Sequence, residues 1–417
     1  MESSLIVVTL IVECLLGFYL LALIALMVGC ARFHRRVRQR RIPADEMHLP
    51  TVSVVVAARN EAGNLPRLLA CLLHQEYPKD KLEIVVVDDR SDDGTEGLLS
   101  KMMAGHDNLK SIRISDERLD FAPKKRALDL GIRSSTGEIV LLTDADCSPP
   151  PTWVRAMVGF YDEGVMVVLG YSPYRFDVPT LRLLRGMLAL DYFSLAAIAA
   201  ASIGLGRPLT ATGTNLSYRK EAFLQANGFE RIKQWISGDD DLFVHLAARE
   251  NLGKFSFALN REAFVPAAAP TSWKQFWHQR IRYASKGTHY EPMMVIGLAS
   301  VYLLNVFIVL AACLTLAGFD DVAWPGLSAW GVKSLFEYAF LRQAAIVFGE
   351  RSLLRYFLPT ALLHPLYVTA FGFLGLLGSF RWKGSRFRKL VSQQSRHDRL
   401  DGDSLSNRLR RDESVSE

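Results

Sequence analysis

Three stretches of the chain decide the fold: VSVVVAARNE at residues 52–61, EIVVVDD at residues 83–89 and EIVLLTDAD at residues 138–146. Each is an apolar run of strand length that ends in polar or acidic residues. Such valine- and isoleucine-rich runs are typical of a parallel sheet with both faces covered. Because ligands of these sheets gather outside the carboxyl ends of the strands, we expect the three polar ends to share one crevice.

The intervening segments predict an alternating order of strands and helices. Helical patterns over Asn64–His74, from about Asp93, and over Lys124–Ile132 separate four expected strands: Val52–Ala58, Glu83–Val87, Leu109–Ile114 and Glu138–Leu142. This order indicates an α/β domain, Rossmann-like, with a mainly parallel sheet. The sequence contains no G-x-G-x-x-G after the first strand and no G-x-x-x-x-G-K-[S/T], which disfavours the two common nucleotide loops.

The composition divides the chain into a polar globular part and apolar segments. Of its 417 residues, 50% are hydrophobic and 22% are charged, and the mean hydropathy is +0.13. The five cysteines are scattered without metal-ligand spacing, so neither a disulfide framework nor a zinc site is indicated. The net charge of +6 lies near the apolar segments, and the aromatic residues are not interleaved with the arginines. This pattern favours a membrane partner and no nucleic acid.

Residues 4–30 predict a transmembrane anchor, because Glu13 is their only charged residue. A signal peptide would need basic residues before the apolar run, whereas here six arginines follow it, between Arg32 and Arg41. The positive-inside rule then places the N-terminus outside and the following domain in the cytoplasm. We therefore expect an integral protein of the cytoplasmic (inner) membrane.

Three more apolar stretches lie at about 293–318, 322–349 and 353–379. The middle one contains Lys333 and Glu337, which can pair because they lie four residues apart on a helix. If all three stretches cross, the basic residues after 380 lie outside, against the positive-inside rule. Either the middle stretch does not cross fully, or the rule fails at this end. The predicted organisation is an anchor (1–31), a basic linker (32–49), the catalytic domain (50–290), membrane or interfacial helices (291–380) and a disordered tail (381–417).

Acidic residues at the strand ends are the strongest candidates for chemistry. Asp144 and Asp146 suit a divalent cation that bridges a diphosphate, because Mg²⁺ and Mn²⁺ take carboxylate oxygen. Asp88 and Asp89 are expected to face the same crevice, while Asp92 or Asp93 caps the next helix. The run Asp239–Asp241 is either an acidic helix start or the place of a general base. Lys124, Lys125 and Arg126 lie at the start of a helix, where positive charge is unfavourable because the helix dipole is positive there. A diphosphate bound nearby would compensate this charge.

Together these residues resemble a membrane-bound family 2 glycosyltransferase with the GT-A fold. The resemblance covers about residues 50–287 and rests on seven pieces in order: Val54–Glu61, Val86–Ser91, Lys124 with Ala127-Leu128, Asp144–Asp146, Gly213–Arg219, Asp239-Asp240 and Gln279–Tyr283. There are two departures from the family pattern. Asp239 replaces the Glu of a Glu-Asp pair, and Tyr283 replaces the Trp of Gln-x-x-Arg-Trp, which makes a processive synthase less certain.

The resemblance implies a role for each matching residue. Asp240 would be the catalytic base, next to Asp239, and Asp144 and Asp146 would bind Mg²⁺ or Mn²⁺. The expected substrate-binding residues are Ala57, Arg59, Glu61, Asp88, Asp89, Lys124, Asp144, Gln279, Arg282 and Tyr283. Leu181–Leu205 is expected as an interfacial amphipathic helix beneath the domain or, given Arg182 and Arg185, as a core helix.

The resemblance thus implies an inverting enzyme that moves a sugar from a nucleoside-diphosphate sugar, with UDP as the expected nucleotide. The acceptor would be a lipid or another membrane-proximal molecule, because Tyr283 lies about ten residues before an apolar segment. Two alternatives stay open: a processive polysaccharide synthase, and a membrane-anchored scaffold that binds sugar nucleotides without catalysis.

Overall fold

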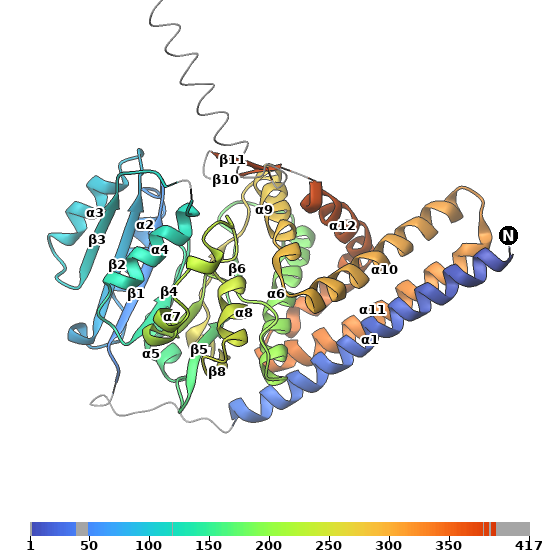
Figure 1. Ribbon diagram of the computed structural model, residues 1–417, viewed down its shortest axis with the longest axis horizontal. Helices are drawn as coiled ribbons and strands as arrows, with labels where there is room; N and C mark the ends of the chain where they lie inside the picture. The colour runs from blue at the N-terminus through green and yellow to red at the C-terminus, as the bar shows by residue number, and fades with distance from the viewer. Residues whose placement is uncertain (1, 39–48, 119, 378, 383–384, 389–417) are drawn as a thin grey trace, which may run out of the picture.

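A seven-stranded sheet forms the centre of the globular part in the computed structural model, which describes residues 2–38, 49–118, 120–377, 379–382 and 385–388 (Figure 1). Its strands are β1 (Val52–Ala58), β2 (Leu82–Asp89), β3 (Leu109–Ile114), β4 (Ile139–Leu142), β5 (Val165–Gly170), β7 (Leu216–Arg219) and β8 (Lys254–Ala258). The order is β3-β2-β1-β4-β7-β5-β8, and only β7 runs antiparallel to its neighbours. This confirms the predicted α/β fold with a mainly parallel sheet.

Helices cover both faces of the sheet because alternate side chains of each strand point to opposite faces. Val54 and Val56 belong to a core with α2 (Leu65–Leu73), α3 (Thr95–Met103) and α5 (Trp153–Val158). Val55 belongs to the opposite core, with α4 (Pro123–Ser134), α8 (Asp241–Arg249) and α6 (Arg182–Gly204). β1 is therefore buried from both sides, with β2 on one edge and β4 on the other.

Four helices among the described residues are long and apolar enough to cross a membrane. They lie within α1 (Glu2–Arg38), α6, α10 (Pro292–Leu316) and the stretch Arg351–Leu376, which contains all but the last residue of α12 (Phe357–Leu377). α11 (Ala323–Phe348) is not among them, yet it packs on α1 and α10 and lies along them (Figure 1). α1 is longer than the predicted anchor, since it continues through residues 32–38 of the predicted linker. The rest of that linker, residues 39–48, is outside the described residues.

α11 keeps its charged groups buried by pairing them. Lys333 is fully buried, and its Nζ lies 2.8 Å from Glu337 Oε1, as the spacing of four residues predicts. Tyr19 of α1 donates a hydrogen bond of 2.6 Å to the same carboxylate, and His364 Nδ1 of α12 lies 3.3 Å from Lys333 Nζ. Three helices therefore meet at one ion pair, which offsets the cost of charge in an apolar bundle.

α6 was expected either as an interfacial helix or as a core helix, and its two ends differ in this respect. Its C-terminal half is buried against α1 and β8, as in a core helix. Its start is exposed, with Leu181 79% and Leu183 54% accessible. Where α1 and α6 cross, Gly29 and Gly204 bring the two backbones together, and a Cβ at either glycine would collide with the opposite helix.

The chain after α12 returns to the globular part. β10 (Ser379–Trp382) pairs antiparallel with β11 (Ser385–Arg388), and β10 packs on α9 (Trp273–Ser285). The predicted disordered tail therefore begins with a paired hairpin within 379–388, because consecutive short strands satisfy each other's backbone groups. Residues 389–417 are outside the described residues.

Candidate active site

A cavity of about 530 Å³ opens at the carboxyl ends of β1, β2 and β4. Its lining includes Ala57, Arg59 and Glu61 from the end of β1, Asp89 from β2, and Asp144 and Asp146 after β4. A cavity of this volume is within the range of small-molecule sites. The three polar strand ends thus meet in one place, as neighbouring parallel strands dictate.

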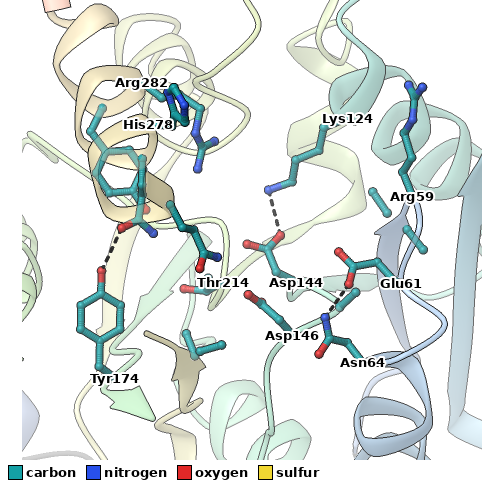
Figure 2. Close-up of a pocket in the computed structure, with 18 of the residues that line it drawn as sticks. Arg59, Glu61, Asn64, Lys124, Asp144, Asp146, Tyr174, Thr214, His278 and Arg282 are labelled. Carbon is teal, nitrogen blue, oxygen red and sulfur yellow. Dashed lines mark hydrogen bonds and ion pairs between the residues drawn. The ribbon is translucent and has the colours of Figure 1, made fainter. Parts of the chain in front are cut away.

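The acid pair after β4 lies opposite the helix α9, which forms the other wall (Figure 2). Asp144 Oδ1 lies 2.8 Å from Lys124 Nζ. Arg175 donates a hydrogen bond of 3.0 Å to the backbone carbonyl of Asp146 and another to Ser148, and so holds the loop in place. Both carboxylates line the cavity, and Asp144 is one-third exposed.

Lys124 joins two acidic segments of the site. Its Nζ lies 2.8 Å from Asp144 and 2.8 Å from Asp239 Oδ2. Burial alone would lower the pKa of Lys124, but these two carboxylates raise it above its ordinary value. The ammonium group therefore stays charged at the edge of the cavity.

The two cations after Lys124 point elsewhere on α4. Lys125 is fully buried and donates hydrogen bonds of 2.5 and 2.8 Å to the carbonyls of Trp235 and Ser237. Burial lowers the pKa of Lys125 to about 8. Arg126 pairs with Asp116 at the surface. Of the three adjacent cations, Lys124 alone lines the cavity.

Asp88 and Asp89 have different places, although both were expected at the crevice. Asp89 lines the cavity and pairs with Arg90 at 2.8 Å and with Arg59 at 3.8 Å. Asp88 does not line it: its carboxylate is buried, accepts from the Ser91 amide and pairs with Arg113 at 2.8 Å. Successive strand residues alternate between the two faces, so only one of a pair can face a given side.

Asp239 and Asp240 stand just behind the cavity wall. The Asp239 carboxylate is 6% exposed beneath Lys124. Asp240 is the N-cap of α8, 18% exposed, and accepts from the amides of Asp241 (2.8 Å) and Gly213 (3.1 Å). Gly213 directly precedes Thr214, which lines the cavity. Asp239–Asp241 can therefore form the start of α8 and also present Asp240 as a base.

α9 supplies a cationic and aromatic wall. The expected Gln279, Arg282 and Tyr283 all line the cavity. Lys274 and His278, which the sequence analysis did not single out, lie on the same face at intervals of four residues from Arg282. Figure 2 shows His278 and Arg282 together across from Lys124 and Asp144. Other lining residues that the analysis missed are Asn64, Tyr174, Tyr192, Ser272 and Gln275.

The donor set suits a hard cation held partly by a ligand. Among the described residues, no group of three or more His, Cys, Asp or Glu side chains is arranged to hold a metal ion. Asp144 and Asp146 offer two carboxylates in the cavity. Mg²⁺ is often held by one or two carboxylates together with water and substrate phosphates, so the residues present fit such an ion.

Part of the chain is similar to known glycosyltransferases. Residues 53–224 match the model of the family described as glycosyl transferase family 2. A probable glycosyltransferase of Bacillus subtilis, YdaM, is 28% identical over 62% of this chain and 60% of its own length. The β-monoglucosyldiacylglycerol synthase of Synechocystis sp. is 27% identical over 58% of this chain and 49% of its own. The chain thus spans about half the length of these curated relatives.

Among solved structures, one match is a mannosyltransferase from Pyrobaculum calidifontis in complex with GDP-mannose and Mn²⁺. It is 21% identical, covers 84% of this chain and 99% of its own, and has a TM-score of 0.48.

Proposed function

We propose that this chain is a glycosyltransferase of family 2, whose model residues 53–224 match. It would be an inverting enzyme that moves a sugar from a nucleoside-diphosphate sugar, with UDP as the nucleotide, to a membrane lipid. The observation that carries the proposal is the cavity in which Asp144, Asp146 and Lys124 face the cationic wall of α9. The relative that makes a glycolipid supports the lipid acceptor.

The mechanism assigns a task to each wall. Arg59, Glu61 and Asp89 hold the nucleoside at the ends of β1 and β2, and Lys124 and Arg282 bind the diphosphate. A divalent cation at Asp144 and Asp146 would neutralise the charge that develops on the leaving diphosphate. Asp240 takes the proton of the acceptor hydroxyl while its oxygen attacks the anomeric carbon. The bond to the diphosphate breaks on the opposite side, which inverts the configuration.

The site also faces the membrane in this proposal. α1, α10 and α11 would cross the bilayer, which leaves the N-terminus outside and the catalytic domain in the cytoplasm of an inner membrane. α11 is less apolar than the four candidate helices, but it packs along α1 and α10 and pairs its buried charges Lys333 and Glu337.

Both ends of α12 lie against the globular part: Gly186 of α6 abuts Tyr356 just before α12, and Gly375 abuts Ala284 of α9. α12 then lies along the cytoplasmic surface, so the basic residues after 380 obey the positive-inside rule. A reporter fused to the C-terminus should be accessible only in inside-out vesicles; access from the outside would contradict this topology.

The direct test is product formation by detergent-solubilised protein. We expect release of nucleoside diphosphate from one nucleoside-diphosphate sugar, dependent on Mg²⁺ or Mn²⁺ and increased by membrane lipid extract. Asp240→Asn should retain nucleotide binding and lose about 10²–10⁴-fold in turnover. A polymeric product without lipid would identify a processive synthase instead. Nucleotide binding without release from any donor would identify a scaffold.

A further inference from the structure

The segment Lys286–Tyr290, which joins α9 to α10, contacts the acidic loop that precedes α8. Lys286 Nζ lies 2.6 Å from Asp241 Oδ2 and 3.5 Å from Asp240 Oδ1. The Tyr290 hydroxyl donates a hydrogen bond to Asp241. Tyr283, at the cavity, precedes Lys286 by three residues, so the same helix end serves the cavity wall and the acidic loop.

The rest of the segment extends this contact. The His289 ring packs edge-on against Trp235, with ring centres 3.7 Å apart, and the Tyr290 ring packs on His245 of α8 at 5.0 Å. Lys125 holds the same loop from the other side through the carbonyls of Trp235 and Ser237. The loop that carries Asp240 is thus held between α4 and the segment that leads into the membrane helix α10.

Lys286 is a buried charge whose partners are both carboxylates. Its side chain is 14% exposed, and that of Asp241 is fully buried. Burial lowers the pKa of Lys286, but Asp240 and Asp241 raise it well above its ordinary value. Burial raises the pKa of Asp241, and Lys286 and Tyr290 outweigh this effect, so that it is lowered. Both groups therefore stay charged, and the closer pair is Lys286 with Asp241.

This arrangement suits a base that changes charge during a reaction. When Asp240 accepts a proton, Lys286 keeps a charged partner in Asp241, so no buried ammonium is left without compensation. When Asp240 loses the proton, the ammonium at 3.5 Å again stabilises its carboxylate. Asp241 holds Lys286 in place during both states.

We propose that Lys286 is a positioning residue of the reaction, which orients the Asp240 carboxylate and assists its return to the charged state. The inference rests on the proposed function, because it takes Asp240 as the base. Tyr290 supports it by fixing Asp241, and the segment connects the base directly to α10.

The test compares Lys286→Met with Lys286→Arg and Tyr290→Phe in the full-length protein, with kcat, KM and the pH profile of kcat as readouts. Lys286→Met should lower kcat about 10²-fold, since misplacement of a reacting group has such an effect. The KM for the donor should change little, and the acid limb of the profile should move to higher pH, because the ammonium 3.5 Å from the Asp240 carboxylate is removed. Lys286→Arg should recover most of the rate, and Tyr290→Phe should shift the acid limb in the same direction by less.

A purely structural role would give a different result. Lys286→Met would then lower the melting temperature and the amount of active protein. In the folded protein that still binds nucleotide, the acid limb of the pH profile of kcat would be unchanged. This outcome overturns the inference. If Lys286→Met does not fold, an unshifted limb in Tyr290→Phe overturns it. If Asp240→Asn is inactive while Lys286→Met behaves as wild type, only the role of Lys286 fails. If Asp240→Asn remains active, the proposed base itself is wrong.

Discussion

The bundle of apolar helices and the globular domain both bury lysines beside carboxylates, but they arrange them differently. In the bundle, Lys333 and Glu337 lie on one helix, and Tyr19 and His364 complete the cluster. In the catalytic domain, Lys124 links two carboxylates from different segments, one of which lines the cavity. The first cluster joins three helices, whereas in the proposed function the second would exchange a protein carboxylate for a substrate phosphate.

Removal of one partner from the Lys333–Glu337 cluster should have the largest effect, and this effect is on stability. Lys333→Met removes the lysine partner of Glu337 and leaves its carboxylate with the Tyr19 hydrogen bond and the more distant His364, so we expect a loss of about 3 kcal/mol in unfolding free energy. Denaturant unfolding in detergent micelles measures it. The double variant Lys333→Met/Glu337→Leu should regain most of the loss, because apolar replacement of a whole buried pair is close to neutral. Equal stability of Lys333→Met and the wild type would show that the pair does not organise the bundle.

Removal of an acid from the cavity beside the Lys124 cluster should instead reduce activity and spare the fold. Asp146→Asn removes one of two cavity carboxylates, and we expect a fall of about 10²–10³-fold in kcat with a higher requirement for Mg²⁺ or Mn²⁺. Initial rates over a metal titration measure both. Asp92→Asn is the matched control, since Asp92 is an exposed strand-end acid outside the cavity lining. A wild-type metal dependence in Asp146→Asn would refute the assignment.

The smallest effect concerns Lys125, whose pKa burial lowers to about 8. Between that value and the ordinary 10.5, the unfolded chain carries a proton that the folded protein lacks. The free energy of unfolding therefore rises with pH between about pH 8 and 10.5. Below pH 8 the full cost of burying the charged Lys125 side chain is present. Lys125→Met should flatten the rise in melting temperature between about pH 8 and 10, relative to the exposed control Lys101→Met. If the melting temperatures of wild type and Lys125→Met changed in parallel with pH, the lowered pKa of buried Lys125 would be contradicted.

The sequence predicted the first half of the sheet well. β1 and β2 are mainly apolar runs buried on both faces, whereas the edge strand β3 is partly exposed and of mixed polarity. Val52–Ala58 and Leu109–Ile114 have the predicted bounds. The second half was not predicted in detail. β7 enters antiparallel between β4 and β5, and this placement depends on long-range pairing that no local pattern encodes.

The residues of the site were likewise predicted only in part. The strand-end acids could be located because parallel neighbours must end at one edge, but which of Asp88 and Asp89 faces the cavity depends on the phase of the strand. On α9, the spacing of Lys274, His278 and Arg282 was a readable signal that the analysis missed. Tyr19 and His364 could not have been assigned to Lys333 and Glu337, because they come from helices far away in the sequence.

The close crossing of α1 and α6 has a practical consequence for anyone who wants a soluble form of the enzyme. Gly29 and Gly204 let the anchor lie directly on a helix that also belongs to the core of the catalytic domain. Deleting α1 would therefore expose an apolar stripe of α6 to water and not simply release a tethered domain. A water-soluble version needs a redesigned α6 surface, with polar residues where Ala201, Gly204 and Leu205 now meet α1.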